Sequence, residues 1–427
     1  MNIDTMRSKD RMMNLLFLDA YFEPETIAYT HLEKDLVGGL VQKNNRVQII
    51  CPVPTRGISD SVKNKYKKRK YEKLYSGRVT VRRFWAPQEG KNPVARAFRY
   101  FWCNLRSYQI GTRIKKADIV FSNSTPPTQG VLSAMVAKNL SKKYKRKLSF
   151  IYNLQDIFPD SLVNTGMTKK GSLLWKIGRK IENYTYKNAD KIVVISEGFK
   201  RNIMAKGVPE EKIEVISNWI DLDSVHPVDR KDNKLISEFG IDSNKFFVVY
   251  AGNFGAAQGA DIVLKAAEKL KDKHDIQFVI FGGGAYFDEA KKEAASMDNV
   301  FIHDLMPTDR ISEVYSLGDV ALITCKPGTG NAGMPSKTWS IMACNTPIIA
   351  SFDTDSDLAD VIRNSGAGKC VEPGNVDALV KAIEATCSAW KAGLHKSENL
   401  REYVGLNASK EICVERYIEV IKAQCNK

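Results

Sequence analysis

The sequence predicts an α/β protein made of two doubly wound domains that face each other across a cleft. Three observations support this prediction. The chain has 427 residues, which is more than one hydrophobic core usually holds. Short apolar runs alternate with helix-length segments in two separate series, as parallel strands with crossover helices do. A polar segment that contains a proline divides the two series and predicts a linker.

The first series of apolar runs predicts the sheet of an N-terminal domain, residues 1–222. Parallel strands are buried on both faces, so each one reads as a short and nearly continuous apolar segment. The predicted strands are residues 14–18, 46–51, 79–85, 118–121, 147–152, 191–196 and 213–217. Stretches long enough for a helix separate most of them, so we expect a Rossmann-like sheet with crossover helices.

The second series predicts a similar C-terminal domain, residues 223–405. Its strands are expected at residues 245–252, 276–282, 299–304, 319–325, 346–351 and 368–373. Each run precedes a helical pattern, and in residues 259–273 the apolar Ile262, Ala266 and Leu270 recur near helical spacing. Residues 222–234 form the expected linker, and residues 406–427 predict a last helix that packs back towards the N-terminal domain.

Composition excludes a secreted or membrane-spanning protein. The eight cysteines are scattered without a C-x-x-C pair, and the histidines do not cluster at metal-ligand spacing. The apolar run near the N-terminus is too short for a secretory signal and is interrupted by Asp19, and no segment approaches the ~18 apolar residues of a spanning helix. We therefore expect a reduced, cytoplasmic protein without structural zinc.

Charge is distributed unevenly along the chain. Residues 1–200 contain 38 basic and 16 acidic residues, a net charge of +22, whereas the remainder has a net charge of −7. The basic residues gather in residues 62–73, 141–147 and 167–180. Such runs can form a solvated face, bind nucleic acid, or bind an anionic membrane surface.

A glycine-rich turn follows the first predicted strand of the C-terminal domain. Gly252, Gly255 and Gly259 lie between that strand and a helix, and glycine lets backbone N–H groups approach an anion closely. The spacing is neither the dinucleotide G-x-G-x-x-G nor a P-loop. The turn therefore predicts either an anion site or simply a tight strand-to-helix connection.

Residues 331–351 predict a second helix start of the same kind. Proline is tolerated at the first helical turn, so Pro335 marks a helix whose next amides, at Ser336 and Lys337, face outward. The ammonium of Lys337 adds a full positive charge to the partial charge of the helix end. A diphosphate would suit both starts, although Lys337 alone is also compatible with an ordinary solvent-exposed lysine.

Asp156 is the candidate acidic residue of the N-terminal domain. It follows the predicted strand 147–152 in the segment IYNLQDIFPDS, and a carboxylate at the carboxyl end of a strand can orient or deprotonate a hydroxyl in the cleft. An aspartate at this position can equally be a helix cap.

Several ordered motifs together resemble glycosyltransferase family 4, which has the GT-B fold. They are residues 189–221, AGNFGAAQG (251–259), 299–324, MACNTPIIAS (342–351) and 365–383. The resemblance covers nearly the whole chain and is strongest from residue 189 to 383. In the first half, NLQDIFPDSLVNTGM resembles the subgroup that assembles bacterial capsule, O-antigen and exopolysaccharide repeat units.

The resemblance implies a retaining, metal-independent transfer of a hexosyl or N-acetylhexosaminyl unit, with no cofactor. The second domain would hold the nucleotide-sugar donor and the first the acceptor, a lipid-diphosphate-linked glycan. UDP is the expected nucleotide, with a guanosine nucleotide as the alternative. The donor-binding residues carried over by position are Gly252, Asn253, Phe254, Gly255, Gln258, Leu305, Met306, Gly333, Met334, Pro335, Ser336 and Ser340.

The chain departs from the family pattern at its charged positions. An arginine and a lysine of the common pattern match Asn253 and Gln258, and two glutamates match Ala332 and Ser340. Our hypothesis is that Lys337 supplies the missing charge. No nucleophile is evident, so the resemblance implies a same-face transfer in which the leaving phosphate accepts the acceptor's proton. Asp156 and Lys337 are the predicted catalytic residues, with Asp156 orienting a hydroxyl.

The resemblance favours a membrane surface over nucleic acid as the partner of the basic half. Residues 92–109 mix Arg96, Arg99 and Arg106 with aromatic residues in a helical pattern typical of interfacial segments, although a core helix with a charged outer face fits as well. We expect a peripheral protein on the inner face of the plasma membrane. The alternatives are a nucleotide-sugar 2-epimerase and a non-catalytic membrane or nucleic-acid adaptor.

Overall fold

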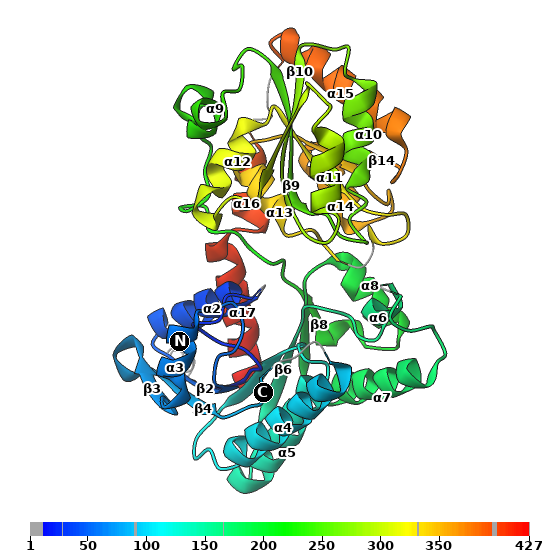
Figure 1. The fold of residues 1–427 in the computed structure, drawn as a ribbon. Helices are drawn as coiled ribbons and strands as arrows, with labels where there is room; N and C mark the ends of the chain where they lie inside the picture. The colour runs from blue at the N-terminus through cyan, green and yellow to red at the C-terminus, as the bar shows by residue number, and fades with distance from the viewer. Residues whose placement is uncertain are drawn as a thin grey trace, which may run out of the picture. The chain divides into compact units, whose positions relative to one another are not determined.

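A computed structural model of the protein describes residues 12–27, 29–88, 92–164, 166–330, 333–394 and 399–426. Its contacts divide the chain into two compact units (Figure 1). The N-terminal unit contains Met1–Ile216 and Cys413–Lys427, and the C-terminal unit contains Ser217–Ile412. The chain therefore enters the second unit once and returns to the first through its last helix, α17 (Lys410–Cys425).

The N-terminal unit is built on an eight-stranded sheet in the order β3-β4-β2-β1-β5-β6-β7-β8. All neighbouring strands are parallel except the edge pair β3 and β4. The strands are β1 (Asn14–Leu18), β2 (Arg46–Pro52), β3 (Tyr71–Leu74), β4 (Val79–Phe84), β5 (Ile119–Asn123), β6 (Ser149–Leu154), β7 (Lys191–Val194) and β8 (Ile213–Val215).

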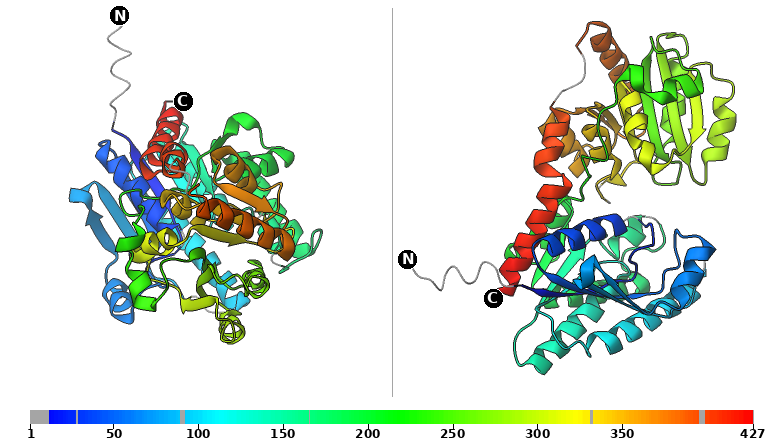
Figure 2. Two further views of the ribbon diagram at one scale, coloured as in Figure 1. Left: turned by 90° about the horizontal axis from the view of Figure 1, so that it is seen from above. Right: turned by 90° about the vertical axis from the view of Figure 1, so that its left-hand side faces the viewer.

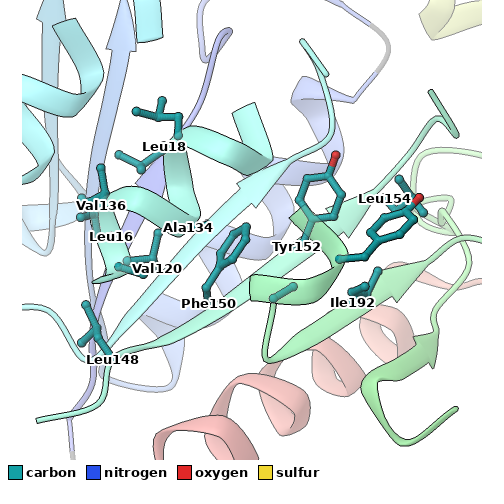
Figure 3. Packing of buried hydrophobic residues seen from close by; sticks show 14 of the residues in the cluster. Leu16, Leu18, Val120, Ala134, Val136, Leu148, Phe150, Tyr152, Leu154 and Ile192 are labelled. Atoms are coloured by element: carbon teal, nitrogen blue, oxygen red, sulfur yellow. The ribbon is translucent and has the colours of Figure 1, made fainter. Parts of the chain in front are cut away.

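Helices cover both faces of this sheet, because the side chains of each strand alternate between two buried faces. Leu16, Val120 and Phe150 pack against α5 on one face (Figure 3). On the other face Phe17 stacks on Phe121, which contacts Tyr417 of α17. The right-hand view of Figure 2 shows the blue α2 and the cyan α4 on opposite faces. The helices of this unit are α2 (Thr30–Gln42), α3 (Asp60–Lys67), η1 (Tyr75–Gly77), α4 (Pro93–Gly111), α5 (Gln129–Tyr144), α6 (Asp160–Asn164), α7 (Leu173–Asn188), α8 (Glu197–Ala205) and η2 (Glu210–Lys212).

The C-terminal unit is built on a six-stranded parallel sheet in the order β11-β10-β9-β12-β13-β14. Its strands are β9 (Phe246–Asn253), β10 (Ile276–Gly283), β11 (Val300–Asp304), β12 (Val320–Thr324), β13 (Ile348–Ser351) and β14 (Gly368–Val371). Its helices are η3 (Arg230–Asp232), α9 (Lys234–Phe239), α10 (Asp261–Lys269), α11 (Phe287–Ala294), η4 (Thr308–Arg310), α12 (Ile311–Leu317), α13 (Lys337–Ala343), α14 (Asp357–Ser365), α15 (Val376–Lys391) and α16 (Leu400–Asn407). Two α/β units with parallel sheets confirm the predicted fold class.

Local signals explain where several of these helices begin and end. The side chain of Ser356 accepts a hydrogen bond from the Ala359 amide at the start of α14, and Gly366 ends that helix with a φ of 68°. Ser172 and Ser196 cap α7 and α8 in the same way. Serine side chains satisfy helix amides that have no partner within the helix, and glycine adopts the left-handed conformation without strain.

Each sheet has one place where the strand order reverses. In the N-terminal unit this place lies between β1 and β5, and in the C-terminal unit it lies between β9 and β12. Connections leave the two strands of such a pair towards opposite sides, which opens a crevice at their carboxyl ends. Ligands of open α/β sheets normally bind there, so these two points locate the candidate site of each unit.

Candidate active site

The glycine turn after β9 lies at the switch point of the C-terminal unit. Lys337, which begins α13, extends to the same place, and its Nζ donates a hydrogen bond to the carbonyl oxygen of Ala251 over 3.0 Å. The ammonium also lies 4.4 Å from the ring centre of Tyr250, within the range of a cation–π contact. Two motifs whose contacting residues are 86 positions apart in the sequence therefore meet at the end of β9.

Gly252 is the residue that permits this contact. A Cβ atom at this position would lie 2.7 Å from the Nζ of Lys337, which is closer than real Cβ contacts. The lysine side chain therefore crosses the backbone where no side chain stands in its way. Any residue larger than glycine would displace the ammonium.

Burial lowers the pKa of Lys337 from its ordinary value of 10.5 to about 8. Moving an ammonium out of water disfavours its charged form, and no carboxylate among the described residues forms an ion pair with it. The side chain is nevertheless partly accessible at the surface. A partly buried cation without a carboxylate partner is suited to bind an anion that enters from outside.

Asn253 and Gln258 form a pair within the same turn. The side-chain amide of Asn253 donates to Oε1 of Gln258 over 3.4 Å. Gly255 leaves room for this pair, since a Cβ atom there would lie 2.5 Å from Oε1 of Gln258 and 2.6 Å from Nδ2 of Asn253. Gly284 has a φ of 107°, and a Cβ atom on it would lie 1.9 Å from Oδ1 of Asn253. The turn thus presents amide groups where the family pattern has cations.

The far end of the turn is fixed to the loop that follows β12. Gly259 has a φ of 57°, and its Cα lies so close to Cys325 that a Cβ atom would meet that residue's backbone at 3.0 Å. The amide of Lys326 donates to the carbonyl of Ala257 over 3.0 Å. Close packing between backbones therefore holds the turn in one conformation at the start of α10.

The other predicted donor residues occupy different environments. Phe254 is 3% exposed and packs between Tyr250 and Phe287, so its side chain belongs to the core. Leu305 is 54% exposed next to Gly283, whereas Met306 packs partly against the core.

The residues around the start of α13 also differ in exposure. Gly333, Met334 and Pro335 are partly buried, Ser336 is exposed, and Ser340 is 7% exposed. The helix begins at Lys337 with Ser336 as its N-cap, two residues after the predicted start at Pro335, whose carbonyl accepts the Thr338 amide. Ala332 lies outside the described residues.

A hollow of about 320 Å³ adjoins the glycine turn between α10 and α11. Gly255 and Phe254 belong to its wall, together with Tyr286 and Lys326, which the sequence motifs did not indicate. Tyr286 is 51% exposed, and its amide donates to the Phe254 carbonyl over 3.0 Å. The wall also carries the carboxylates of Asp261, Glu289 and Glu293, so acidic groups outnumber the one cation in this hollow.

Asp156 lies just after β6 in the N-terminal unit, at the carboxyl edge of the sheet. Its Oδ2 accepts a hydrogen bond from the hydroxyl of Ser161 in α6 over 3.1 Å, and its amide donates to Oγ of Ser124 over 3.2 Å. Partial burial of the carboxyl group, together with the nearby Asp160, raises the pKa of Asp156. The residue itself remains exposed, so a ligand can reach it.

A buried network at the switch point of the N-terminal unit was not predicted. Asp19 follows β1 and Glu33 lies on α2, and both carboxyl groups accept hydrogen bonds from the side-chain amide of Asn123, over 3.0 and 3.2 Å. Burial raises the pKa of Asp19 to about 6, and burial together with the charge of Asp19 raises the pKa of Glu33 well above its ordinary value. Two buried carboxyl groups that share one donor retain a proton at mildly acidic pH. In the sequence only Asp19 stands directly after an apolar run, whereas Glu33 lies within a helix and Asn123 is the last residue of β5.

Two family models match the two halves of the chain. A model described as Glycosyltransferase Family 4 matches residues 34–224, and one described as Glycosyl transferases group 1 matches residues 231–408. The chain belongs to glycosyltransferase family 4. This finding confirms the resemblance seen in the sequence motifs.

Curated relatives of this glycosyltransferase are similar over most of their length. The probable glycosyltransferase WbjE of Pseudomonas aeruginosa is 27% identical over 76% of this chain and 81% of its own. The putative colanic acid biosynthesis glycosyl transferase WcaI of Escherichia coli strain K12 is 26% identical over 64% of this chain and 67% of its own.

Solved structures show the same fold at low sequence identity. Sucrose-phosphate synthase from Thermosynechococcus elongatus has a TM-score of 0.71 and 14% identity, and covers 96% of this glycosyltransferase and 98% of its own chain. HepE of Anabaena, solved in complex with UDP, has a TM-score of 0.69 and 15% identity, and covers 96% of this chain and 100% of its own.

Proposed function

We propose that the protein is a retaining glycosyltransferase that moves the sugar of a UDP-sugar donor to a hydroxyl of a lipid-diphosphate-linked glycan. The reaction would belong to the assembly of a surface polysaccharide. The observation that carries this proposal is the contact of Lys337 with the end of β9. That contact provides a cation at a strand-order switch point, next to a glycine turn whose backbone is accessible. A nucleotide diphosphate matches this combination of groups.

The comparisons support the donor and the pathway. HepE has the same fold and was solved with UDP and with UDP-glucose, which supports a uridine nucleotide here. WcaI is described as a colanic acid biosynthesis enzyme, which supports a role in polysaccharide assembly.

Lys337 would act on the leaving group. When the bond between the sugar and the diphosphate breaks, negative charge develops on the phosphate oxygens, and an ammonium held in a partly dry site stabilises that charge strongly. The diphosphate would in turn raise the pKa of Lys337, because an opposite charge favours the protonated form. The leaving phosphate then accepts the acceptor's proton on the same face of the sugar, and the configuration at the anomeric carbon is retained.

The N-terminal unit would hold the acceptor. Asp156 is exposed at the carboxyl edge of its sheet, so its carboxylate can accept a hydrogen bond from a sugar hydroxyl and orient it.

The exposed side of α4 supports attachment to a membrane surface. Val94, Phe98, Phe101 and Leu105 recur at helical spacing and are 77%, 57%, 65% and 38% exposed. A core helix would bury such residues, so the interfacial interpretation is favoured. Arg99 differs from the expectation, because it is 2% exposed and donates to Thr55 and to the Pro87 carbonyl. No helix in the described ranges is long and apolar enough to cross a bilayer.

Thermal unfolding with a panel of nucleotides tests the donor. We expect UDP to raise the melting temperature more than GDP or ADP, since a ligand at 100 times its Kd stabilises the folded state by about 2.7 kcal/mol. If no nucleoside diphosphate raised the melting temperature, the proposal would be contradicted.

NMR of the transfer product tests the mechanism. An α-linked donor should give an α-linked product, whereas a β-linked product would refute retention. Formation of an epimer from donor alone would instead identify a 2-epimerase.

A further inference from the structure

A wide groove of about 800 Å³ lies at the amino-terminal edge of the N-terminal sheet. Its wall is formed by the starts of β1 and β2, by residues 77–82, which include the start of β4, and by residues 110–116, which follow from the end of α4. Asp156 and Asp19 follow the carboxyl ends of their strands, at the opposite edge of the same sheet. With about 3.3 Å per residue, the five residues of β1 separate the two edges by about 17 Å.

Four arginines line this basic groove: Arg46, Arg78, Arg82 and Arg113. Arg78 donates to the side chain of Asn44, and Arg82 lies 5.6 Å from the ring centre of Tyr71. The Nε of Arg82 is buried without a hydrogen-bond partner, which is costly for a charged group. The arginines come from different strands and from the segment after α4, so the fold brings them together.

Three lysines, Lys73, Lys115 and Lys116, complete the positive lining, and no acidic residue lines the groove. None of the seven cations forms an ion pair within the described part of the chain. Asp118, two residues beyond Lys116, is buried and already pairs with Arg146 over 2.7 Å. Seven like charges in one concave surface repel one another, and nothing described in this unit neutralises them.

A purely structural role explains only part of this cluster. A basic residue just after the end of α4 can interact favourably with the negative end of the helix dipole, which accounts for Arg113. Arg46, Arg78 and Arg82 lie on or next to strands and have no such partner. Thr80 and Gln48 line the same groove. The side-chain amide of Gln48 donates to the carbonyl of Lys116 over 2.8 Å and so fixes that segment.

We propose that the basic groove of the N-terminal unit is a second anion-binding site, different from the glycine turn of the C-terminal unit, that takes a ligand with two or more phosphate groups. Guanidinium groups bind phosphate through two parallel hydrogen bonds, and a phosphomonoester brings about −1.5 to −2 charges at neutral pH. The volume exceeds what one phosphate needs. The same chemistry is found in clustered headgroups of anionic lipids and in free oligophosphorylated molecules, and the experiment below separates these sources.

Binding of inorganic tripolyphosphate to the full-length protein is the direct test. Calorimetry compares the wild type with Arg46→Gln/Lys116→Gln, in which two of the exposed cations of the groove are neutralised. The matched control is Lys65→Gln/Lys68→Gln, which removes the same charge from exposed lysines of the same unit outside the groove. Lys337→Ala tests for binding at the glycine turn.

We expect the groove variant to lose at least about tenfold in affinity while the control binds like the wild type. Lys337→Ala, which affects only binding at the glycine turn, should keep the binding that the groove variant loses. Equal affinity in the groove variant, loss in Lys337→Ala alone, or no binding by the wild type would overturn the proposal. Flotation with vesicles of phosphatidylcholine, with and without phosphatidylglycerol, identifies the source. If the groove variant no longer binds anionic vesicles, the ligand is a lipid headgroup. If it still binds these vesicles but has lost affinity for tripolyphosphate, the ligand is a free oligophosphorylated molecule.

Discussion

Replacement of Lys337 by methionine separates a catalytic cation from a structural lysine. Methionine keeps much of the aliphatic volume but removes the charge that contacts Ala251 and Tyr250. If Lys337 stabilises the leaving diphosphate, kcat/KM should fall about 10²- to 10³-fold, which corresponds to about 2.7–4 kcal/mol of transition-state stabilisation. Folding should not suffer, because the charge is costly to bury.

The stability change follows from the lowered pKa. A folded-state pKa of about 8 against an ordinary value of 10.5 means that the protonated lysine destabilises the folded state below pH 8. This cost disappears as the pH rises from 8 to 10.5, where the unfolded chain binds more protons than the folded one. Lys337→Met should therefore be more stable than the wild type at pH 7 by about 1–3 kcal/mol, after allowance for the lost hydrogen bond and ring contact.

The assay combines transfer kinetics with denaturant unfolding from pH 6.5 to 9.5. With a pKa of about 8, Lys337 is mostly protonated at pH 7, and kcat/KM should decline about tenfold per pH unit above pH 8. That decline should be absent from the residual activity of Lys337→Met. Lys265→Met, which removes an exposed lysine of α10, is the matched control. Unchanged kcat/KM, or a less stable Lys337→Met with an unaltered pH profile, would refute the reasoning.

Three further predictions rest on other contacts. Gly252→Ala should lower kcat at least about tenfold with the fold intact, because the new methyl group would displace the ammonium of Lys337; circular dichroism and kinetics check this. Phe98→Ser/Phe101→Ser should weaken the free energy of vesicle binding by about 3 kcal/mol or more, because two exposed aromatic side chains are removed. Transfer to a soluble acceptor should continue. Glu33→Gln should unfold at a higher temperature than the wild type at pH 8 but not at pH 4. The pKa of Glu33 is raised in the folded state, so the wild type loses stability as the pH increases from 4.5, whereas glutamine does not ionise. Melting curves across this range would contradict the assignment if the difference did not grow with pH.

The strands were predictable because burial on both faces leaves a plain pattern. All thirteen predicted runs correspond to strands of the two sheets, with ends that differ by a few residues. The strand β3 was missed because it is an antiparallel edge strand whose four residues, YEKL, alternate in exposure. Only Glu72 of this strand is buried, so no apolar run marks it.

The candidate site was predictable in its parts but not in its contacts. The glycine turn and the PSK segment each carry a local signal, namely conformational freedom and a helix start. That Lys337 crosses over Gly252 depends on how α13 packs beside β9, which no local pattern specifies. The pairing of Asp19 and Glu33 through Asn123 was hidden for the same reason, because Asn123 is 104 residues from Asp19 and 90 from Glu33.

The loss of the family's cations from the turn and the presence of Lys337 are physically connected. A cation at position 253 or 258 would repel the ammonium at the same switch point and lower the pKa of Lys337 further. Since burial alone already brings this pKa to about 8, an additional positive neighbour would leave much of the lysine neutral at pH 7. Amides at Asn253 and Gln258 avoid this repulsion and still offer hydrogen bonds. Gln258→Lys should therefore shift the decline in kcat/KM to lower pH, and an unchanged pH profile would show that the two positions act independently.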